Sequence, residues 1–267
     1  MLTLEHISKT FNPGTVNQKQ ALCDLNLEVH KGDFITILGS NGAGKSTLFN
    51  AIAGSFIADS GRILLDGRDV TFLPEHKRSG EIGRLFQDPM KGTAPSMTIE
   101  ENMSLAYLRT AKKGMGFSRI TRTDREWFRA QLARLGLGLE DRMKQPVGLL
   151  SGGQRQALTL LMATMVTPKL LLLDEHTAAL DPGTAEKVLN LTKEIVEQKQ
   201  ITCLMITHNL ASSLELGNRT LMMDAGRIVL DVAGQERSGL TVQDLLDRFK
   251  VGAGKQLDND RILLSAQ

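Results

Sequence analysis

The chain has 267 residues, of which 41% are hydrophobic and 23% are charged. These fractions are close to the averages for folded globular proteins and exclude disorder of the chain as a whole, because enough apolar surface is present to form a core. The 32 Lys and Arg residues and the 30 Asp and Glu residues leave a formal net charge of +2. This balance argues against a dedicated nucleic-acid-binding protein, since such proteins carry a stronger basic bias.

The cysteines and the apolar runs do not indicate a secreted or membrane-spanning protein. Cys23 and Cys203 lie within apolar runs and match no zinc or redox spacing, so two buried structural thiols are expected. Residues 1–6 lack the basic and apolar regions of a signal peptide. The aliphatic run Leu170–Leu173 is far shorter than the ~20 residues that cross a bilayer. We therefore expect a cytoplasmic protein that reaches a membrane only through a partner.

The first ninety or so residues predict short strands around one glycine-rich turn. Alternating apolar and polar residues, or short apolar runs, mark these strands. They are expected over Leu2–Ile7, Leu22–Val29, Asp33–Leu38, Arg62–Leu65 and Ile82–Phe86. A helix over Lys45–Ala53 follows the turn. The alternating strands at the front predict an antiparallel layer in which one face is solvated.

The segment between about Pro89 and Pro146 differs from its surroundings, because helix formers dominate and β-branched runs disappear. This composition predicts a mostly helical insert. Its middle, Arg109–Arg125, is strongly basic and contains one acidic residue, Asp124. The basic segment is either a solvated loop or a contact for RNA or anionic lipid head groups.

After Ser151 helices alternate with fully apolar strands. Helices are expected over Gln154–Thr167, Thr184–Gln198 and Val242–Phe249, the last followed by a polar tail. Strands are expected over Leu170–Leu173, Ile201–Ile206, Arg219–Met223 and Arg227–Asp231. Buried strands that alternate with helices are typical of an α/β fold around a mainly parallel sheet.

A phosphate-binding motif stands at the glycine-rich turn. Residues 39–46 read Gly-Ser-Asn-Gly-Ala-Gly-Lys-Ser and fit the pattern G-x-x-x-x-G-K-[ST] in full, with a strand expected before them and a helix after them. The glycines let several backbone N–H groups converge on one anion at a helix N-terminus, where the helix dipole adds positive charge. Lys45 is placed to reach the β- and γ-phosphates of a nucleotide, and Ser46 to ligate Mg²⁺.

An acidic pair supplies the second half of a nucleotide site. The apolar strand Leu170–Leu173 delivers Asp174 to a sheet edge, where its carboxylate can hold Mg²⁺ directly or through water. Glu175 follows at once and can polarise a water for in-line attack on the γ-phosphorus. Taken alone, the two residues would also fit a merely structural acidic strand end.

A third motif, Leu150–Gln154, reads Leu-Ser-Gly-Gly-Gln at the start of a predicted helix. Its paired glycines expose backbone N–H groups and Ser151 adds a hydroxyl, so the motif predicts a second anion site at a helix N-terminus. The bare pentapeptide would also fit an ordinary helix cap. Its position between the phosphate loop and the acidic strand makes it far more specific.

Together these motifs resemble the ATP-binding-cassette (ABC) family over roughly residues 1–235. Leu150–Gln154 matches the family's signature, Gln87 its Q-loop, Ala179–Asp181 its D-loop and His208 its switch histidine. In that family two cassettes form a head-to-tail dimer, and each ATP lies between the phosphate loop of one and the signature of the other. The resemblance implies ATP contacts at Gly39, Ser40, Asn41, Gly42, Ala43, Gly44, Lys45, Ser46 and Thr47, and at Ser151, Gly152, Gly153, Gln154 and Asp181.

The resemblance also assigns roles to single residues. Gln87 is expected to touch Mg²⁺ or the attacking water and to signal to the helical insert, although alone it would suit a solvated strand end. His208 is expected to donate a hydrogen bond to the γ-phosphate, although alone it would suit a capping or core histidine. The catalytic set implied is Glu175, His208, Gln87 and Lys45, and the metal-binding set is Ser46, Gln87 and Asp174.

Two positions match the family less directly. Phe11 stands where the family stacks an aromatic residue, often Tyr, on adenine, and core packing is the alternative for this ring. His176 follows Glu175 where the family commonly has a proline. Because a proline would fix the local φ angle, the entry to the D-loop is expected to be less rigid here. A catalytic role for His176 is the less favoured alternative.

The resemblance implies a P-loop NTPase fold with three regions. Residues 1–88 and 151–235 are expected to form the ATP-binding core with its antiparallel β layer. Residues 89–150 are expected to form the inserted helical subdomain, and residues 236–267 a C-terminal helix and tail.

A single cassette without a membrane span resembles bacterial importers, in which ATPase, permease and binding protein are separate chains. The sequences of residues 83–90 and 174–182 resemble those of importer ATPases whose cargo is an amino acid or a similar small solute. The expected partners are a second copy in the ATP state, a transmembrane permease at the cytoplasmic face of the cell membrane and, indirectly, a substrate-binding protein. No nucleic acid is expected. The alternatives are an exporter ATPase and a non-transport cassette that acts on nucleic acid or the ribosome.

The family's permease inserts a short helix into a groove beside the Q-loop. On this chain the corresponding segment is Asp88–Leu108. Its adaptable apolar side chains are candidates for that contact, although they would equally suit the insert's own core. These are Met90, Met97, Met103 and Leu105.

Overall fold

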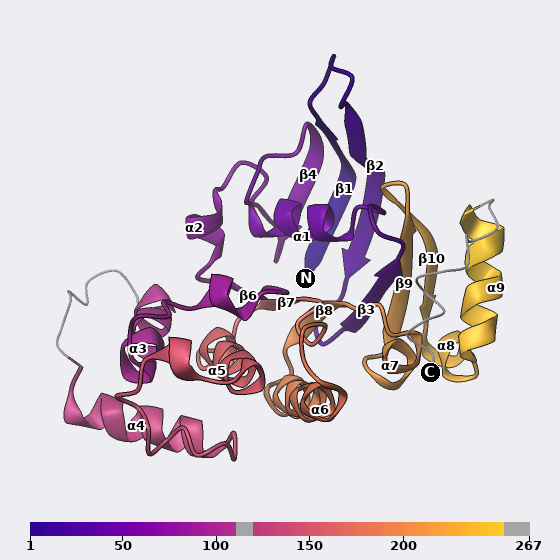
Figure 1. Cartoon of the computed structure of the whole chain (residues 1–267). Coiled ribbons are helices and arrows are strands. Elements are labelled where there is room, and N and C mark those ends of the chain that lie inside the picture. Colours follow the sequence, from indigo (N-terminus) through magenta and orange to yellow (C-terminus); the bar gives the residue numbers. More distant parts are fainter. Residues whose placement is uncertain (111–119, 254–267) are drawn as a thin grey trace. The chain divides into compact units, whose positions relative to one another are not determined.

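The computed structural model describes residues 1–110 and 120–253 (Figure 1). The chain divides into two units. The first unit comprises Met1–Arg78 and Thr202–Gln267, and the second unit comprises Ser79–Ile201. Within the described ranges, none of the helices combines the length and the apolar character needed to cross a bilayer.

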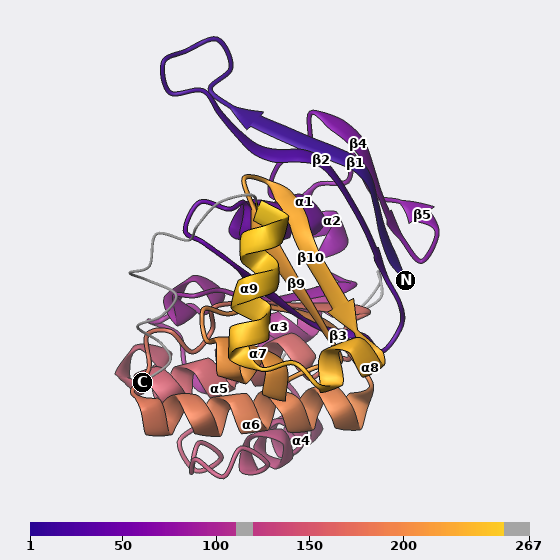
Figure 2. The same cartoon turned by 90° about the vertical axis from the view of Figure 1, so that its right-hand side faces the viewer.

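An antiparallel sheet of four strands opens the first unit. Its order is β2 (Lys19–Val29), β1 (Leu2–Phe11), β4 (Ser60–Leu65) and β5 (Arg68–Asp69). The predicted antiparallel layer is thereby confirmed. Figure 2 shows that β1 and β2 run on together past β4 into a long hairpin, so that β1 ends at Phe11 rather than at Ile7.

The first unit also contains parallel strands. β3 (Phe34–Gly39) lies between β8 (Thr202–Ile206) and β9 (Arg219–Asp224) and is parallel to both, while β10 (Arg227–Ala233) pairs antiparallel with β9. Every residue of β3 and β8 is buried, as continuous apolar runs predict for a parallel sheet. Because β3 and β8 run the same way, the segments that follow them leave the sheet at one edge.

The helices of the first unit are α1 (Lys45–Ala53), α2 (Glu75–Arg78), α7 (Leu210–Glu215), α8 (Gly234–Ser238) and α9 (Val242–Ala253). α9 runs beside β9 and β10 (Figure 2). Its residues Leu245, Leu246 and Phe249 pack in one buried cluster with Met222 of β9 and Val232 of β10. These side chains recur at helical spacing, so they place one apolar face of α9 on the strands.

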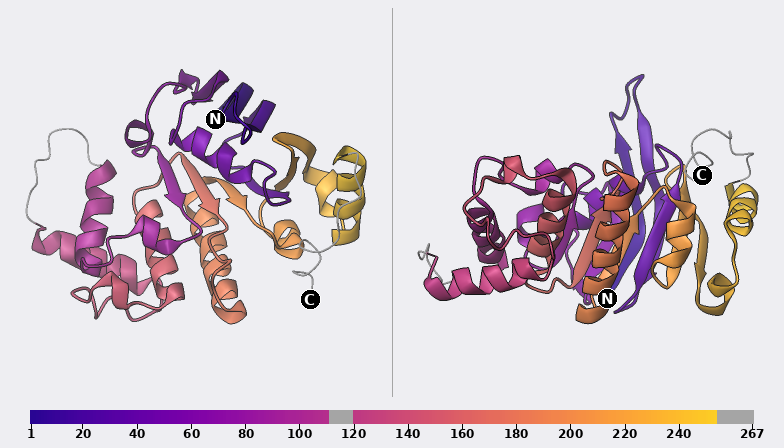
Figure 3. Two further views of the ribbon diagram at one scale, coloured as in Figure 1. Left: turned by 45° about the horizontal axis from the view of Figure 1, so that its top comes forward. Right: turned by 60° about the horizontal axis from the view of Figure 1, so that its bottom comes forward.

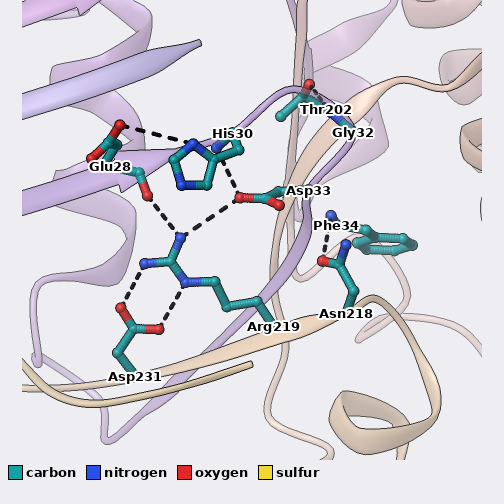
Figure 4. Close-up of polar contacts among 9 residues, drawn as sticks. All are labelled: Glu28, His30, Gly32, Asp33, Phe34, Thr202, Asn218, Arg219 and Asp231. Carbon is teal, nitrogen blue, oxygen red and sulfur yellow. Dashed lines mark hydrogen bonds and ion pairs between the residues drawn. The ribbon is translucent and has the colours of Figure 1, made fainter. Parts of the chain in front are cut away.

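A partly buried arginine joins the antiparallel sheet to the β9–β10 hairpin (Figure 4). Arg219 makes a two-pronged pair with Asp231, at 2.7 Å from Nε and 2.6 Å from Nη2. Its Nη1 donates to the Glu28 carbonyl at 2.7 Å and lies 3.6 Å from a carboxylate oxygen of Asp33. The hydrogen bonds that Arg219 donates to Asp231 raise the pKa of Arg219, with Asp33 adding to the effect. Planar, bidentate pairing of this kind fixes geometry as well as charge.

The second unit contains two parallel strands and a group of helices. β6 (Ile82–Leu85) pairs with β7 (Leu170–Asp174). The helices are α3 (Ile99–Thr110), α4 (Arg122–Ala133), α5 (Gly152–Thr164) and α6 (Pro182–Lys199), with 3₁₀ turns at Pro89–Gly92 and Val147–Leu149. Figure 3 shows α3, α4 and α5 gathered in the second unit, where Met103, Phe128 and Leu158 belong to one buried cluster. The predicted helical insert and the α/β class are confirmed.

One expectation about burial was wrong in part, and one open alternative is decided by the structure. Cys203 is fully buried, but Cys23 is partly exposed, because it lies on the face of β2 opposite to the buried Leu22. Met103 is fully buried in the core of the second unit, so it is not available to a partner. Met90 and Leu105 are 39% and 47% exposed, as a docking contact requires.

Candidate functional site

The phosphate loop, residues 39–46, joins β3 to α1 in the first unit. Gly39, Gly42 and Gly44 have φ angles of +144°, +83° and +103°, which L side chains rarely adopt. A Cβ on Gly44 would lie 2.5 Å from the carbonyl oxygen of Ala21, so only glycine fits there. The loop is held from outside by the β9–β10 turn, since Gly226 N–H donates to the Ala43 carbonyl at 2.9 Å.

Lys45 begins α1 and folds its side chain back across the loop. Its Nζ donates to the carbonyls of Gly39 at 2.7 Å and Ser40 at 3.1 Å, and the residue is only 5% exposed. Ser46 and Thr47 follow in the first turn of the helix. No side chain caps the N-terminus of α1. The N-cap residue is Gly44, so α1 begins directly at the glycine-rich loop, which is the arrangement of a phosphate site at a helix N-terminus.

Lys19 is a further cation beside the loop that the motif analysis did not single out. Its Nζ would lie 3.2 Å from a Cβ placed on Gly42. The residue starts β2, far from the motif in sequence, and no pattern in the sequence links the two. The hairpin of β1 and β2 is what carries this ammonium group to the phosphate loop.

Phe11 lies at the end of β1 in the first unit. Its ring meets Phe56 edge to face, with centroids 5.6 Å apart, and Lys9 Nζ lies 5.8 Å from its centroid. Phe11 is nevertheless 38% exposed. Packing therefore covers only part of the Phe11 ring, and the rest of its surface is accessible for stacking.

His208 is positioned by the strand next to the phosphate loop. It follows β8, and Thr207 N–H donates to the Ile37 carbonyl of β3 at 3.2 Å. Asn209 then caps α7 by accepting from Ser212 N–H at 2.9 Å. Because β3 and β8 are parallel neighbours, the structure brings His208 and residues 39–46 to the same edge of the sheet.

The second unit brings Gln87 and the acidic pair to one edge in the same way. Gln87 follows β6 and is exposed, while Asp174 ends the parallel neighbour β7 and is 9% exposed. Glu175 has a φ angle of +45°. A non-glycine residue in this region is uncommon and costs backbone strain of about 1–3 kcal/mol. Backbone strain of this kind clusters at active sites, ligand clamps and switch regions.

The signature and the D-loop both begin helices in the second unit. Ser151 caps α5 and forms a reciprocal capping box with Gln154, at 3.2 Å in each direction. Asp181 caps α6 by accepting from Thr184 N–H at 3.0 Å. Hydrogen bonds from the side chain and from the backbone of Thr184 lower the pKa of Asp181. A Cβ on Gly153 would collide with the Thr184 methyl group, so that glycine lets the two helix starts approach closely.

His176 lies in the core of the second unit rather than at its surface. It is 3% exposed, and its Nε2 lies 3.1 Å from the Thr192 hydroxyl of α6. Burial lowers the pKa of His176 to about 4. The ring is therefore neutral near pH 7 and joins the end of β7 to α6. These contacts favour a structural role over a catalytic one.

Sequence comparison relates the chain to one family. The ABC transporter family model matches residues 22–178. A tyrosine transport ATP-binding protein of Clostridioides difficile is 43% identical over 94% of this chain and 99% of that protein. A methionine import ATP-binding protein, MetN, of Rhizobium johnstonii is 38% identical over 78% of this chain. The chain covers only 56% of that MetN protein.

Solved structures give the same fold. A dimeric post-hydrolysis structure of an ATP-binding cassette bound to ADP and Pi matches 87% of this chain and 98% of that one, with a TM-score of 0.75 and 27% identity. The ADP conformation of another ABC transporter cassette matches 96% of this chain and 99% of that one, with a TM-score of 0.74 and 29% identity. The predicted P-loop NTPase fold is thereby confirmed.

Proposed function

The chain belongs to the ABC transporter family and is an ATP-binding, ATP-hydrolysing cassette, and we propose that it energises the import of an amino acid. The tyrosine transport relative, matched over nearly the full length of both chains, supports this substrate class. The observation that carries the ATPase role is the complete phosphate loop between β3 and α1, with the Lys45 side chain held across it. Tyrosine is our first candidate for the cargo.

We propose that the expected residues divide the work as follows. Residues 39–47 bind the phosphates of ATP, and Phe11 stacks on the adenine. Lys19 adds a second ammonium group beside the loop. Glu175 takes the proton from the attacking water, and its strained φ angle supports a side chain that is aimed rather than incidental. His208 senses the γ-phosphate.

Mg²⁺ is the metal that the donor set suits. Ser46, Gln87 and Asp174 offer a hydroxyl, an amide and a carboxylate, and hard oxygen ligands of this kind bind Mg²⁺ together with nucleotide phosphates. When bound, the ion neutralises charge on the β- and γ-phosphates. The buried position of Asp174 at the end of β7 supports its assignment as the anionic ligand.

We propose that the working assembly contains two copies of this chain on a transmembrane permease. The dimeric cassette structure to which the chain is similar supports the pairing. Ser151, Gly152, Gly153, Gln154 and Asp181 of one copy face the ATP held by the other. The chain then acts at the cytoplasmic face of the membrane, and a substrate-binding protein delivers the amino acid to the permease.

Hydrolysis is tested with Glu175→Gln. Removing the base should lower the Mg²⁺-dependent rate of phosphate release by about 10²–10⁴-fold without abolishing ATP binding. Glu186→Gln is the matched control, because Glu186 is an exposed carboxylate on α6. Unchanged turnover in Glu175→Gln would contradict the assigned role, as would an equal loss in Glu186→Gln.

The substrate class is tested in cells that lack the gene for this chain. Uptake of labelled tyrosine should fall and should be restored by the wild-type gene but not by Glu175→Gln. Labelled methionine and spermidine, cargoes named for other relatives, serve as comparison solutes. Loss of spermidine uptake with normal tyrosine uptake would contradict the amino-acid assignment. Loss of methionine uptake with normal tyrosine uptake would keep the substrate class and replace tyrosine as the cargo.

A further inference from the structure

A charged cavity lies in the second unit, in the helical region rather than at the residues assigned to ATP. Its volume is about 570 Å³, within the ~300–1,000 Å³ typical of small-molecule sites. One wall is a face of α4 and the other is the segment 141–145. Five cationic and three acidic side chains line it, so its walls carry a net positive charge.

The arginines of α4 are arranged to face this cavity together. Arg122, Arg125 and Arg129 recur at spacings of three and four residues, which places them on one side of a helix. Arg125 is held at the cavity by Glu100, because its Nε lies 2.6 Å from that carboxylate; the Arg125 side chain is 54% exposed and the Glu100 side chain 11% exposed. Among the ion pairs of the described residues at the cavity, this one has the most buried carboxylate.

The remaining acidic residues neutralise the other cations only weakly. Arg122 pairs with Glu126 at 3.0 Å, but both side chains are well exposed, and Arg129 lies 3.6 Å from an exposed Asp141. Exposed pairs of this kind contribute little to stability, so a better anion can displace them.

The opposite wall adds two cations that have no acidic partner in the described part of the chain. Arg142 donates only to the backbone carbonyls of Leu137 and Gly138, at 3.3 Å and 3.2 Å. Lys144 is exposed and makes no hydrogen bond or ion pair with a described residue. The wall is held in place from behind, since Ile99 and Glu100 N–H groups donate to the Gln145 and Met143 carbonyls at 3.1 Å and 2.9 Å.

We propose that this cavity binds a phosphate-bearing ligand. Guanidinium groups on both walls and an ammonium group on one of them match the several acceptor oxygens and the negative charge of a phosphate group. The ligand is either a free phosphorylated small molecule or the head group of an anionic phospholipid. Both carry the same chemistry, and the site is separate from the phosphate loop, which belongs to the first unit.

The binding test uses the chain's single tryptophan as a local reporter. Trp127 lies on α4 between two of the cavity's arginines. The full chain is first saturated with Mg²⁺ and ADP to fill the phosphate loop, and pyrophosphate is then titrated while the emission of Trp127 is recorded. The wild type should show a saturable change in emission.

The variant Arg129→Gln/Lys144→Gln removes one cation from each wall and should weaken pyrophosphate binding by roughly tenfold or more. The control Arg134→Gln/Lys193→Gln removes the same charge from the second unit outside the cavity and should bind as the wild type does. Thermal unfolding of both variants establishes that they fold. The proposal is overturned if the wild type does not bind, or if the two double variants bind equally.

A second arm separates the two sources of the phosphate group. The protein is sedimented with vesicles of equimolar phosphatidylglycerol and phosphatidylcholine, and with vesicles of phosphatidylcholine alone. Binding to the anionic vesicles that is lost in Arg129→Gln/Lys144→Gln but kept in the control assigns the site to a lipid head group. Pyrophosphate binding without vesicle binding assigns it to a free phosphorylated molecule.

Discussion

The two cysteines differ in environment and should differ in reactivity. Cys203 is fully buried in β8, and burial raises the pKa of its thiol, so the reactive thiolate is scarce and inaccessible. Cys23 is partly exposed, and Arg227 Nη2 lies 2.7 Å from its sulfur. A thiol reagent should therefore modify one cysteine in the native protein and both after denaturation.

A cysteine substitution identifies which thiol reacts in the native protein. Cys23→Ser should leave no fast-reacting thiol, because Cys203 is buried. Fast modification of Cys203 in the native protein would contradict its burial in the first unit.

The sequence predicted the residues of the phosphate loop and the acidic pair because their chemistry depends on neighbours along the chain. Gly39–Ser46 form a motif whose strand and helix are adjacent in sequence. Lys19 could not be found in this way, since the β1–β2 hairpin alone brings it to Gly42. His176 was expected to loosen the D-loop entry, whereas it is buried against Thr192, a contact that no local pattern reveals.

At the level of elements, a buried arginine caps the C-terminus of α1, the helix that begins with Lys45. Arg78 is 1% exposed and donates to the carbonyls of Ala51 and Ile52 at 2.8 Å each, which are in the last turn of α1. It also donates to Leu73 at 2.7 Å. A cation at the C-terminus of a helix satisfies orphan carbonyls and complements the helix dipole.

Arg78→Met should therefore destabilise the protein by about 3 kcal/mol, because several buried carbonyls lose their donor. Arg78→Lys should restore only part of this, since one ammonium group cannot replace a planar guanidinium. Lys77→Met is the control, because its side chain is exposed. Urea unfolding measures these differences, and a fully stable Arg78→Met protein would refute the capping role.

The same arginine shows why element boundaries were easier to predict than the contacts between elements. The runs that became β3, β7 and β8 were clear, because parallel strands buried on both faces are continuously apolar. No pattern in the sequence distinguishes Arg78 from an ordinary surface arginine. Gly54, where a Cβ would lie 2.7 Å from Arg78 Nε, leaves the room for it, and these two positions are far apart in the chain.

At the scale of the whole molecule, transmission to a permease should depend on exposed apolar residues of the second unit. Met90 and Leu105 are exposed within the segment Asp88–Leu108, whereas Met97 is half-buried and Met103 is in the core. Met90→Glu and Leu105→Glu should abolish transport and spare ATP hydrolysis by the isolated chain, because a charge in an apolar contact is costly to bury.

Val251→Glu is the control for these substitutions, since Val251 is 84% exposed on α9 of the first unit. Its transport and its hydrolysis should match those of the wild type. If transport survives both Met90→Glu and Leu105→Glu, the permease contacts a different surface.

Assembly of two copies should depend on ATP itself. We expect the isolated chain to be mostly monomeric without nucleotide, because the anion site at Ser151 gains its ligand only from ATP bound to a second copy, and a ligand that binds the dimer stabilises it by mass action. Glu175→Gln should keep ATP uncleaved and accumulate dimers. Light scattering with ATP, with ADP and without nucleotide measures this.

Ser151→Arg in the Glu175→Gln background should abolish the dimers, since a bulky side chain would occupy the place of the phosphate. Ser151 also caps α5, and losing a cap costs about 1 kcal/mol. Ser151→Ala loses the same cap without the bulk, so it should retain dimers that Ser151→Arg does not form. A monomeric Glu175→Gln protein with ATP would mean that two copies of the chain alone do not close on the nucleotide. A stable dimer without nucleotide would point to an interface other than the signature.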